Sequence, residues 1–347
     1  MVIYNFYYYV KPFIPRFLQI IVRRKVARRK RELNQHNWPI DNKAAISPEG
    51  WAGWPEKKQF ALVLHHDVDT AKGHKKCHPL IELEEKMGFR SSYNFVPERY
   101  NVSSDLRRYL IEKGFEVGVH GLKHDGKLFL SKERFQKQAI RIRQYLKEWQ
   151  SVGFVSPSMH RNLDWIGELE IEHDCSTFDV DPYEPQPEGV RTIFPFWVPT
   201  TRNVQLETRN STNPSNLSRE MGNLFHRDPS NPSNPSNSSG FVELPYTLPQ
   251  DFTLFVLLQE KSIDIWKQKL DWIVEHGGMA LLITHPDYMN GKTAKCDLEE
   301  YPMAFYEEFL DYVKSKYEGQ YWHALPKDVA RFWKEKMMIP QSSKSVE

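Results

Sequence analysis

The chain has 347 residues, of which 40% are hydrophobic and 27% are charged. This composition fits one large or two small globular domains and excludes a disordered chain, and the net charge of +2 gives no support for a nucleic-acid partner. Cys77, Cys175 and Cys296 lie far apart in the sequence and form no CxxC pair, which argues against a disulfide framework and a thiolate zinc site. We therefore expect a protein of a reducing compartment, the cytoplasm.

The N-terminal segment MVIYNFYYYVKPFIPRFLQIIV is apolar and aromatic, but Lys11, Pro12 and Pro15 interrupt it. A membrane-spanning helix needs about 20 mostly apolar residues, and a secretory signal carries its positive charge before its apolar part. Here the basic run, residues 23–31, comes afterwards, so neither description fits. The pattern is typical of a segment that lies on a membrane surface, and residues 1–31 are predicted to make that contact. The alternative is an extension packed on the domain, with its basic helix solvated.

From about residue 58, apolar runs typical of strands alternate with helical patterns. Strands are expected at 60–64, 92–96, 115–119, 152–155, 177–178, 241–244 and 279–284, and helices at 79–87, 106–113, 131–149, 263–275, 303–316 and 326–337. This alternation predicts βαβ units and a mostly parallel sheet, and the number of repeats in one block favours a barrel over an open sheet. We therefore expect an α/β barrel over residues 46–340, after an N-terminal extension of residues 1–45.

One segment breaks this alternation. Residues 201–240 contain STNPSN and then DPSNPSNPSNSSG, with almost no apolar side chains. Such a tract cannot offset the entropy that ordering it would cost. We predict that it is a disordered Asn/Pro/Ser insertion in a surface loop.

Polar side chains follow several of the strands, where parallel barrels place their active-site residues. His120 and His124 come after the third strand, and they share one side if the segment forms a helical turn. One carboxylate from another strand end would complete a set of two histidines and one carboxylate. That set suits zinc or another divalent metal and leaves positions open for water and substrate. Asp67 and Asp69 follow the first strand; if Asp69 binds the metal, Asp67 can lie near it as a general base.

Other histidines near this set have their own interpretations. His66 is expected at the strand-end cleft with the two aspartates, so His65 should point away from it by the two-residue period of a strand. His74 and His78 are expected at the surface of the following loop and helix. His285 follows the strand at 279–284 and adds a polar group at the same edge of the barrel.

The ordered motifs HHDVDT, HGLKHDG, SPS and LLITHPDY resemble those of the polysaccharide deacetylase family, also called the NodB-homology or carbohydrate esterase family 4 group. The resemblance covers residues 58–290 apart from the insertion. It implies a distorted (β/α) barrel, a divalent metal that is usually zinc, and hydrolysis of an N-acetyl group from an amino sugar. The expected partner is therefore an N-acetylated carbohydrate.

The same resemblance implies roles for individual residues. Asp67 matches the catalytic base of the family, and His285 matches the general acid. Asp69, His120 and His124 match the metal ligands. The stretch STFDVDPYEPQPEGVRTIFPFW resembles the fourth motif region, with potential cleft residues Asp179, Asp181 and Trp197. Candidate platforms for sugar rings are Trp197, Tyr183 and Tyr288.

One position departs from the family pattern. Val155 stands where the third motif usually has an arginine that orients the base, and Arg161, six residues on, is the nearest substitute in the sequence. Two alternatives therefore accompany the deacetylase prediction. One is a metal-dependent amidase acting on a small non-carbohydrate C–N bond, and the other is a catalytically weak homologue that binds metal or glycan.

Overall fold

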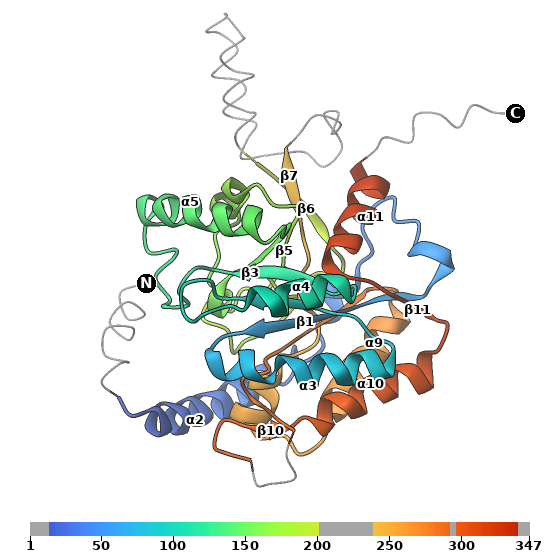
Figure 1. Ribbon diagram of the computed structural model, residues 1–347. Helices are drawn as coiled ribbons and strands as arrows, with labels where there is room; N and C mark the ends of the chain where they lie inside the picture. The colour runs from blue at the N-terminus through green and yellow to red at the C-terminus, as the bar shows by residue number, and fades with distance from the viewer. Residues whose placement is uncertain (1–13, 201–238, 292–295, 339–347) are drawn as a thin grey trace, which may run out of the picture.

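The computed structural model describes residues 14–200, 239–291 and 296–338, and the predicted insertion lies outside these residues apart from its two ends. Within them a nine-stranded sheet has the order β11–β1–β2–β3–β4–β5–β7–β6, with β8 as a further neighbour of β1 (Figure 1). The strands are β1 (Phe60–Val68), β2 (Ser92–Phe95), β3 (Glu116–His120), β4 (Gly153–Val155), β5 (His173–Asp174), β6 (Phe196–Pro199), β7 (Gly240–Glu243), β8 (Met279–Thr284) and β11 (Tyr321–His323). A separate pair is formed by β9 (Met289–Asn290) and β10 (Tyr301–Pro302).

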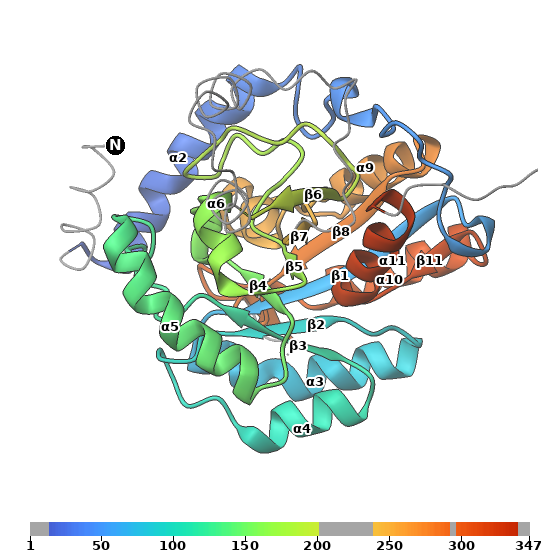
Figure 2. The same cartoon turned by 90° about the horizontal axis from the view of Figure 1, so that it is seen from above.

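Helices surround the strands, as the view from above shows (Figure 2). They are α2 (Arg16–Asn34), α3 (Ala71–Met87), α4 (Ser104–Glu112), α5 (Lys132–Glu148), α6 (Leu163–Ile166), α9 (Asp264–Glu275), α10 (Ala304–Tyr317) and α11 (Pro326–Met338). Short 3₁₀ turns occur at η2 (Asn42–Ala45), η3 (Pro55–Lys57), η4 (Pro157–Met159) and η5 (Gly167–Leu169), and η7 (Phe252–Leu258) is a π-helix. No helix of the described residues is long and apolar enough to cross a bilayer.

The sheet is parallel throughout except where β6 runs antiparallel to β7. It curls toward closure because the chain after β7 reaches β8: Leu248 bridges Leu282, and the Thr247 amide donates to the Leu281 carbonyl at 3.1 Å. These contacts give the distorted (β/α) barrel that the sequence predicts. The carboxyl ends of its parallel strands therefore gather at one edge, where barrels place their functional side chains.

The central strand β1 is longer than predicted, and the difference affects the site. It continues from Phe60 to Val68 with every residue buried, instead of ending at residue 64. Since side chains alternate along a strand, His65 and Asp67 share one face, whereas His66 faces the outer layer. There His66 Nε2 lies 2.9 Å from the Glu84 carboxylate of α3. The predicted orientations of His65 and His66 were therefore wrong.

The helix after β1 also starts earlier than predicted. It begins at Ala71 rather than 79, with Thr70 as N-cap accepting from the Lys72 amide at 3.1 Å, and Pro79 lies in its interior. Proline is favoured at the first helical position, which is why Pro79 suggested a helix start at residue 79. By contrast, α5 begins where the sequence predicts a helix to start, with Ser131 as its N-cap accepting from the Arg134 amide at 3.2 Å.

The two ends of the insertion are adjacent in the fold. The Thr200 amide donates to the Ser239 carbonyl at 2.8 Å, next to the β6–β7 pairing. Deleting residues 208–238 should therefore leave the melting temperature unchanged or slightly raised, because a shorter loop costs less closure entropy, by about 0.6 kcal/mol per halving of its length. Thermal unfolding followed by circular dichroism checks this. Val242→Asp, in buried β7, is the destabilised control, and a drop in the deletion variant of more than about 5 °C, roughly 3 kcal/mol of lost stability for a domain of this size, would show that the tract packs on the domain.

Candidate metal and catalytic site

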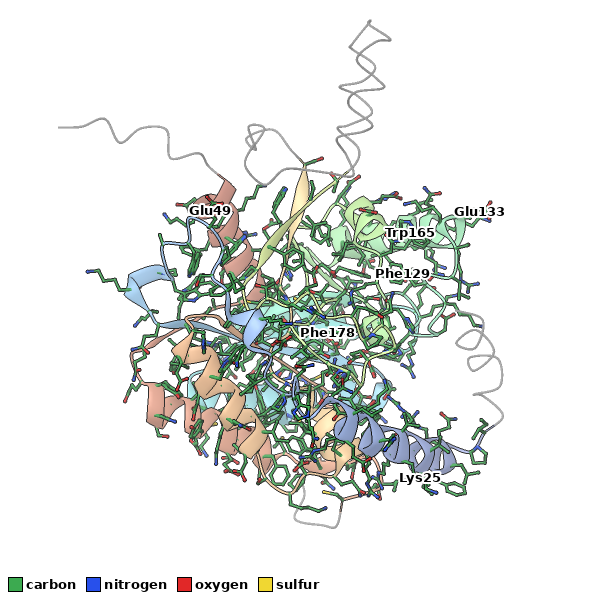
Figure 3. All side chains as sticks on the ribbon, turned by 180° about the vertical axis from the view of Figure 1, so that it is seen from behind. Lys25, Glu49, Phe129, Glu133, Trp165 and Phe178 are labelled. Carbon is green, nitrogen blue, oxygen red and sulfur yellow. The ribbon has the colours of Figure 1, made fainter. Side chains whose placement is uncertain are left out.

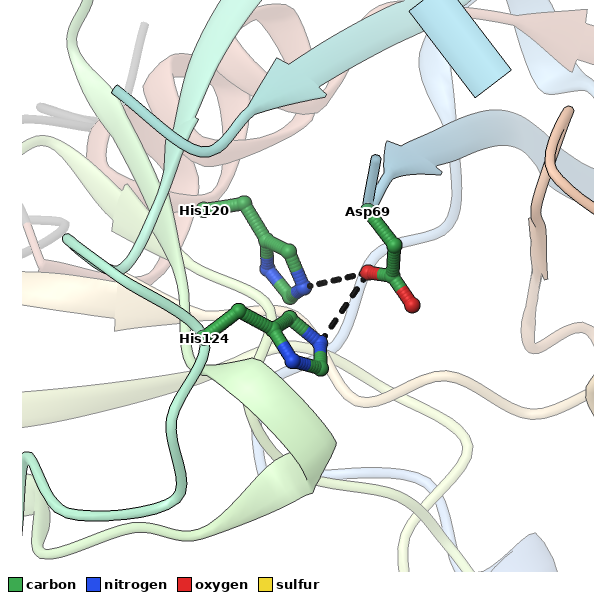
Figure 4. Close-up of side chains that lie close together, drawn as sticks. All are labelled: Asp69, His120 and His124. Carbon is green, nitrogen blue, oxygen red and sulfur yellow. Dashed lines mark ion pairs between the residues drawn. The ribbon is translucent and has the colours of Figure 1, made fainter. Parts of the chain in front are cut away.

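The structure brings together the three side chains predicted to bind a metal. Asp69 follows β1, His120 ends β3 and His124 lies in the loop after it (Figure 4). The Nε2 atoms of His120 and His124 lie 3.3 Å and 3.0 Å from the same Asp69 oxygen, Oδ1. One ligand atom from each residue lies within 4.8 Å of the others. Asp69 Oδ1 is buried without an aligned hydrogen-bond donor, as expected for an oxygen that serves a cation.

The loop after β3, rather than a helical turn, sets the spacing of the two imidazoles. Gly121 has φ 61° and His124 has φ 52°, both in the left-handed region. A Cβ on Gly121 would lie 2.4 Å from the Pro157 Cγ atom, so only glycine fits this turn. The chain thereby returns His124 beside His120, with ring centroids 5.1 Å apart. The predicted pairing of the histidines is present, but its structural basis differs from the prediction.

The backbone fixes the orientation of His120. Its Nδ1 lies 3.2 Å from the Val155 carbonyl oxygen, a contact that needs the proton on Nδ1. The Nε2 atom then points toward Asp69, where a cation would take the place of its proton. This arrangement is usual for a histidine that binds a metal, whose second nitrogen donates to a carbonyl or carboxylate. Two imidazoles and one carboxylate form a donor set that fits zinc and similar divalent ions.

Asp67 and Asp69 are both held as carboxylates. Burial alone would raise the pKa of Asp69, but the imidazoles of His124 and His120 outweigh it and hold the pKa well below its usual range. For Asp67 burial also acts upward, yet His120 and His65 lower the pKa to about 2. An ionised Asp67 beside the cluster is suited to accept a proton.

His65 is the close partner of Asp67. Its Nε2 lies 2.8 Å from Asp67 Oδ1, and both side chains are only 1% exposed. The second ion-pair partner of Asp67 in the described part of the chain is His120, with Nδ1 3.9 Å from Oδ2. His65 therefore lies beside Asp67, although the sequence predicts that His65 points away from the cleft.

Arg161, the nearest substitute in the sequence for the arginine that Val155 replaces, is engaged elsewhere in the structure. Val155 is completely buried. The Arg161 guanidinium contacts the backbone carbonyls of Gln186 and Glu188 and lies over the Phe178 ring, with Cζ 4.8 Å from the centroid. These contacts hold its guanidinium on the neighbouring loops. The close partner of Asp67 is instead His65, on the same strand.

His285 follows β8 and is paired with Asp251, for which the sequence predicts no role. Its Nδ1 lies 2.7 Å from Asp251 Oδ1, and its backbone amide donates to Oδ2 at 2.8 Å. The Tyr301 hydroxyl donates to the same Oδ2 at 2.9 Å. Burial alone would lower the pKa of His285, but the Asp251 carboxylate outweighs it and raises the pKa to about 10. His285 is therefore an imidazolium at neutral pH.

Asp251 gave little signal in the sequence because a lone aspartate before the apolar run FTLFVLL resembles a helix cap. It does accept from the Phe252 amide at 2.7 Å as well. A second missed carboxylate, Asp287, accepts from the Asp69 amide at 2.9 Å and from the Thr70 hydroxyl. It holds the loop that carries Asp69. These two acids orient the site without belonging to the metal-binding set.

The cluster lies in a large cleft of ≈ 1230 Å³ between α2 and the barrel. Asp67, Asp69, His120, His124 and His285 all line it. Of the predicted sugar platforms, Tyr183 and Tyr288 line the cleft as well, whereas Trp197 does not.

The predicted cleft residues of the fourth motif region do not line the cleft either. Asp179 instead forms a buried ion pair with Lys269 at 2.5 Å. Asp181 accepts from the Tyr246 hydroxyl at 2.8 Å. Those predictions were wrong because buried carboxylates with internal partners look the same in a sequence as cleft residues. His74 differs from prediction too: it is half-buried, and its Nε2 accepts from the Ser103 amide at 3.2 Å.

Comparisons with known proteins identify the fold. A protein named as a polysaccharide deacetylase from Mycobacterium smegmatis is 15% identical and covers 87% of this chain and 99% of its own, with a TM-score of 0.57. A protein named as a polysaccharide deacetylase from Pseudomonas aeruginosa PAO1 has 15% identity, coverage of 87% and 100%, and a TM-score of 0.54. The chain has the polysaccharide deacetylase fold. The PuuE allantoinase shares it at 15% identity, coverage of 87% and 99%, and a TM-score of 0.55. No protein-family model and no curated protein sequence matches the chain.

The metal-binding role of the cluster can be tested by measuring how much zinc the purified protein holds. His124→Ala should remove most of the zinc that the purified protein binds, because two ligands hold a divalent ion far less tightly than three. His74→Ala, at a half-buried histidine outside the cluster, should keep its zinc. Elemental analysis of both variants decides the assignment, and equal zinc in the two would reject it.

Proposed function

We propose that this protein is a metal-dependent hydrolase that removes an N-acetyl group from an amino sugar or glycan. The observation that carries the proposal is the convergence of Asp69, His120 and His124 in a large cleft, with an ionised Asp67 and a charged His285 lining the same space. An amide is a poor electrophile and water a poor nucleophile, so its hydrolysis needs a base, an acid and a centre that polarises the carbonyl. The cleft holds candidates for all three.

A divalent cation held by Asp69, His120 and His124, with Zn²⁺ as the ion that the donor set suits best, would polarise the acetyl carbonyl and make a bound water more acidic. Asp67 accepts the proton of the attacking water as the new C–O bond forms. His285 donates its proton to the sugar nitrogen as the C–N bond breaks, so that a neutral amine leaves. The products are acetate and the free amino sugar.

The partners of Asp67 and His285 prepare these two steps. His65, 2.8 Å from Asp67 Oδ1, holds the carboxylate in one orientation. Asp251, 2.7 Å from His285 Nδ1, keeps the imidazole charged and leaves Nε2 as its other proton-bearing atom. Because each proton-transfer group has a buried partner, neither needs to reorganise during the reaction.

The size of the cleft favours a sugar or glycan. Its volume of ≈ 1230 Å³ exceeds the roughly 300–1,000 Å³ of ordinary small-molecule pockets. Tyr183 and Tyr288 give it aromatic surface, which commonly packs against sugar rings. The second candidate, an amidase acting on a small C–N bond, is favoured by the likeness to an allantoinase structure, but such a substrate would fill only a small part of this space.

The proposed reaction predicts release of acetate from soluble N-acetylated oligosaccharides, lost when a chelator removes the metal and restored by added Zn²⁺. Asp67→Asn should reduce the rate by at least about 100-fold, since it removes the general base, while bound zinc is retained. Asp105→Asn, at an exposed side chain of α4, should have no effect. If wild type and Asp67→Asn are equally inert toward these sugars while both bind zinc, the protein is a binding homologue or acts on another C–N bond.

The pairing of His285 with Asp251 predicts a pH dependence. The general acid works only while protonated, so the rate should fall as the pH rises through the pKa of His285, about 10. Asp251→Asn removes the charge that raises this pKa and leaves the burial that lowers it, so the falling limb of the pH–rate profile should move to lower pH by about one unit or more.

Tyr301→Phe is the matched control, because it removes a hydrogen bond to Asp251 Oδ2 and keeps the carboxylate charge. Its pH–rate profile should stay close to that of wild type. If the falling limb of the pH–rate profile does not move in Asp251→Asn, His285 is not the general acid.

A further inference from the structure

Helix α2 exposes the apolar side chains that a helix on a globular domain ordinarily buries. Of the eleven large apolar side chains that are exposed in the described residues, six lie on this one helix: Phe17, Leu18, Ile21, Val22, Val26 and Leu33. Its buried residues are only Gln19, Ile20 and Ala27. Gathered apolar exposure of this kind marks a surface that contacts a partner.

Polar contacts fix this orientation of the helix. The Arg24 guanidinium donates to the Val256 carbonyl at 2.9 Å and to the Leu298 carbonyl at 2.7 Å. Lys30 Nζ donates to the Pro182 carbonyl at 2.6 Å. Because these bonds attach the inner face, Phe17 and Ile21 are left exposed outside the cleft, and Leu18, Val22 and Val26 lie at the side of the helix that borders it. The side chains of α2 project from the edge of the molecule, where Lys25 is labelled (Figure 3).

The exposed surface combines apolar and positive character. Phe17, Ile21 and Val22 lie in the first half of the helix, and exposed cations follow, among them Lys25 and Arg29. The helix RFLQIIVRRKVARRKRELN contains a single acidic residue, Glu32. An apolar stretch next to a basic one matches a bilayer with anionic headgroups, since the apolar groups enter the acyl boundary while the cations meet the headgroups. A second copy of this surface would repel the first.

We propose that α2 is a docking surface for an anionic lipid bilayer. Its position also orients the catalytic cleft, because Leu18, Val22 and Val26 of the same helix line the space that contains Asp69 and His124. Docking therefore places the mouth of the cleft at the membrane surface. On the proposed function, on which this step rests, the substrate class that fits is a lipid-linked N-acetylated sugar, whose apolar part would follow the α2 wall.

Vesicle flotation of the full-length protein tests the docking surface. Wild type should float with vesicles containing anionic phosphatidylglycerol at least about tenfold more than with neutral phosphatidylcholine vesicles, and the difference should shrink at high salt. The double variant Phe17→Ser, Ile21→Ser should lose about tenfold or more of this binding. Its matched control is Ile111→Ser, Ile140→Ser, which removes side chains of similar exposure on α4 and α5 and should bind as wild type does.

A second matched pair of double variants tests the exposed cations. Lys25→Gln, Arg29→Gln should weaken binding by about tenfold or more, whereas Lys137→Gln, Lys147→Gln on exposed α5 positions should not. Failure of wild type to float, or full binding by the Phe17, Ile21 variant, overturns the proposal. So does a wild-type dimer that becomes monomeric in that variant, because the apolar surface would then join two copies.

Acetate release from soluble sugars separates this proposal from the proposed function. Phe17 and Ile21 are not among the residues that line the cleft, so their double variant should keep the soluble activity of wild type and its melting temperature. Loss of vesicle binding with retained activity supports the docking surface. If the protein binds vesicles but releases acetate from no acetylated sugar, docking on the bilayer is supported and a lipid-linked N-acetylated sugar is rejected as the substrate.

Discussion

The site depends on one geometric constraint, the convergence of three side chains from two strand ends on a single point. Asp69 lies beyond β1, while His120 and His124 lie at the end of β3 and in its loop, separated from β1 by β2 in the sheet. Two nitrogen atoms within 3.3 Å of one carboxylate oxygen are costly to assemble in a buried place unless charge or a cation joins them. The other features of the site support this convergence. Asp287 holds the Asp69 loop, Gly121 permits the turn to His124, and the Val155 carbonyl orients His120.

The two groups proposed to transfer protons, Asp67 and His285, line the same cleft around that point. Each is a titratable side chain whose pKa is displaced by its buried neighbours, downward for Asp67 through His120 and His65 and upward for His285 through Asp251. Pairs whose environments push their pKa values apart are the usual arrangement for a base and an acid that act in one cleft. The departure at Val155 does not leave Asp67 without a partner, because His65 lies on the same face of β1.

The strand–helix alternation and the ordered motifs were enough to predict the barrel and to select Asp69, His120 and His124 as neighbours. They failed where the outcome depended on the length of an element or on distant partners. The faces of His65 and His66 depend on β1 continuing to Val68, which the charges in HHDVD concealed. Asp251 drew no prediction and Asp179 was predicted to line the cleft, yet Asp251 pairs with His285 and Asp179 pairs with Lys269 in the interior. Only the fold distinguishes them.

The most direct measurement is an anomalous-difference map from crystals of the full-length protein grown with zinc, recorded on both sides of the zinc absorption edge. We expect one strong peak at bonding distance, roughly 2.0–2.2 Å, from Asp69 and from both imidazoles. A zinc-loaded crystal with its peak elsewhere, or with His120 and His124 turned away from it, would show that these three residues do not form the metal site.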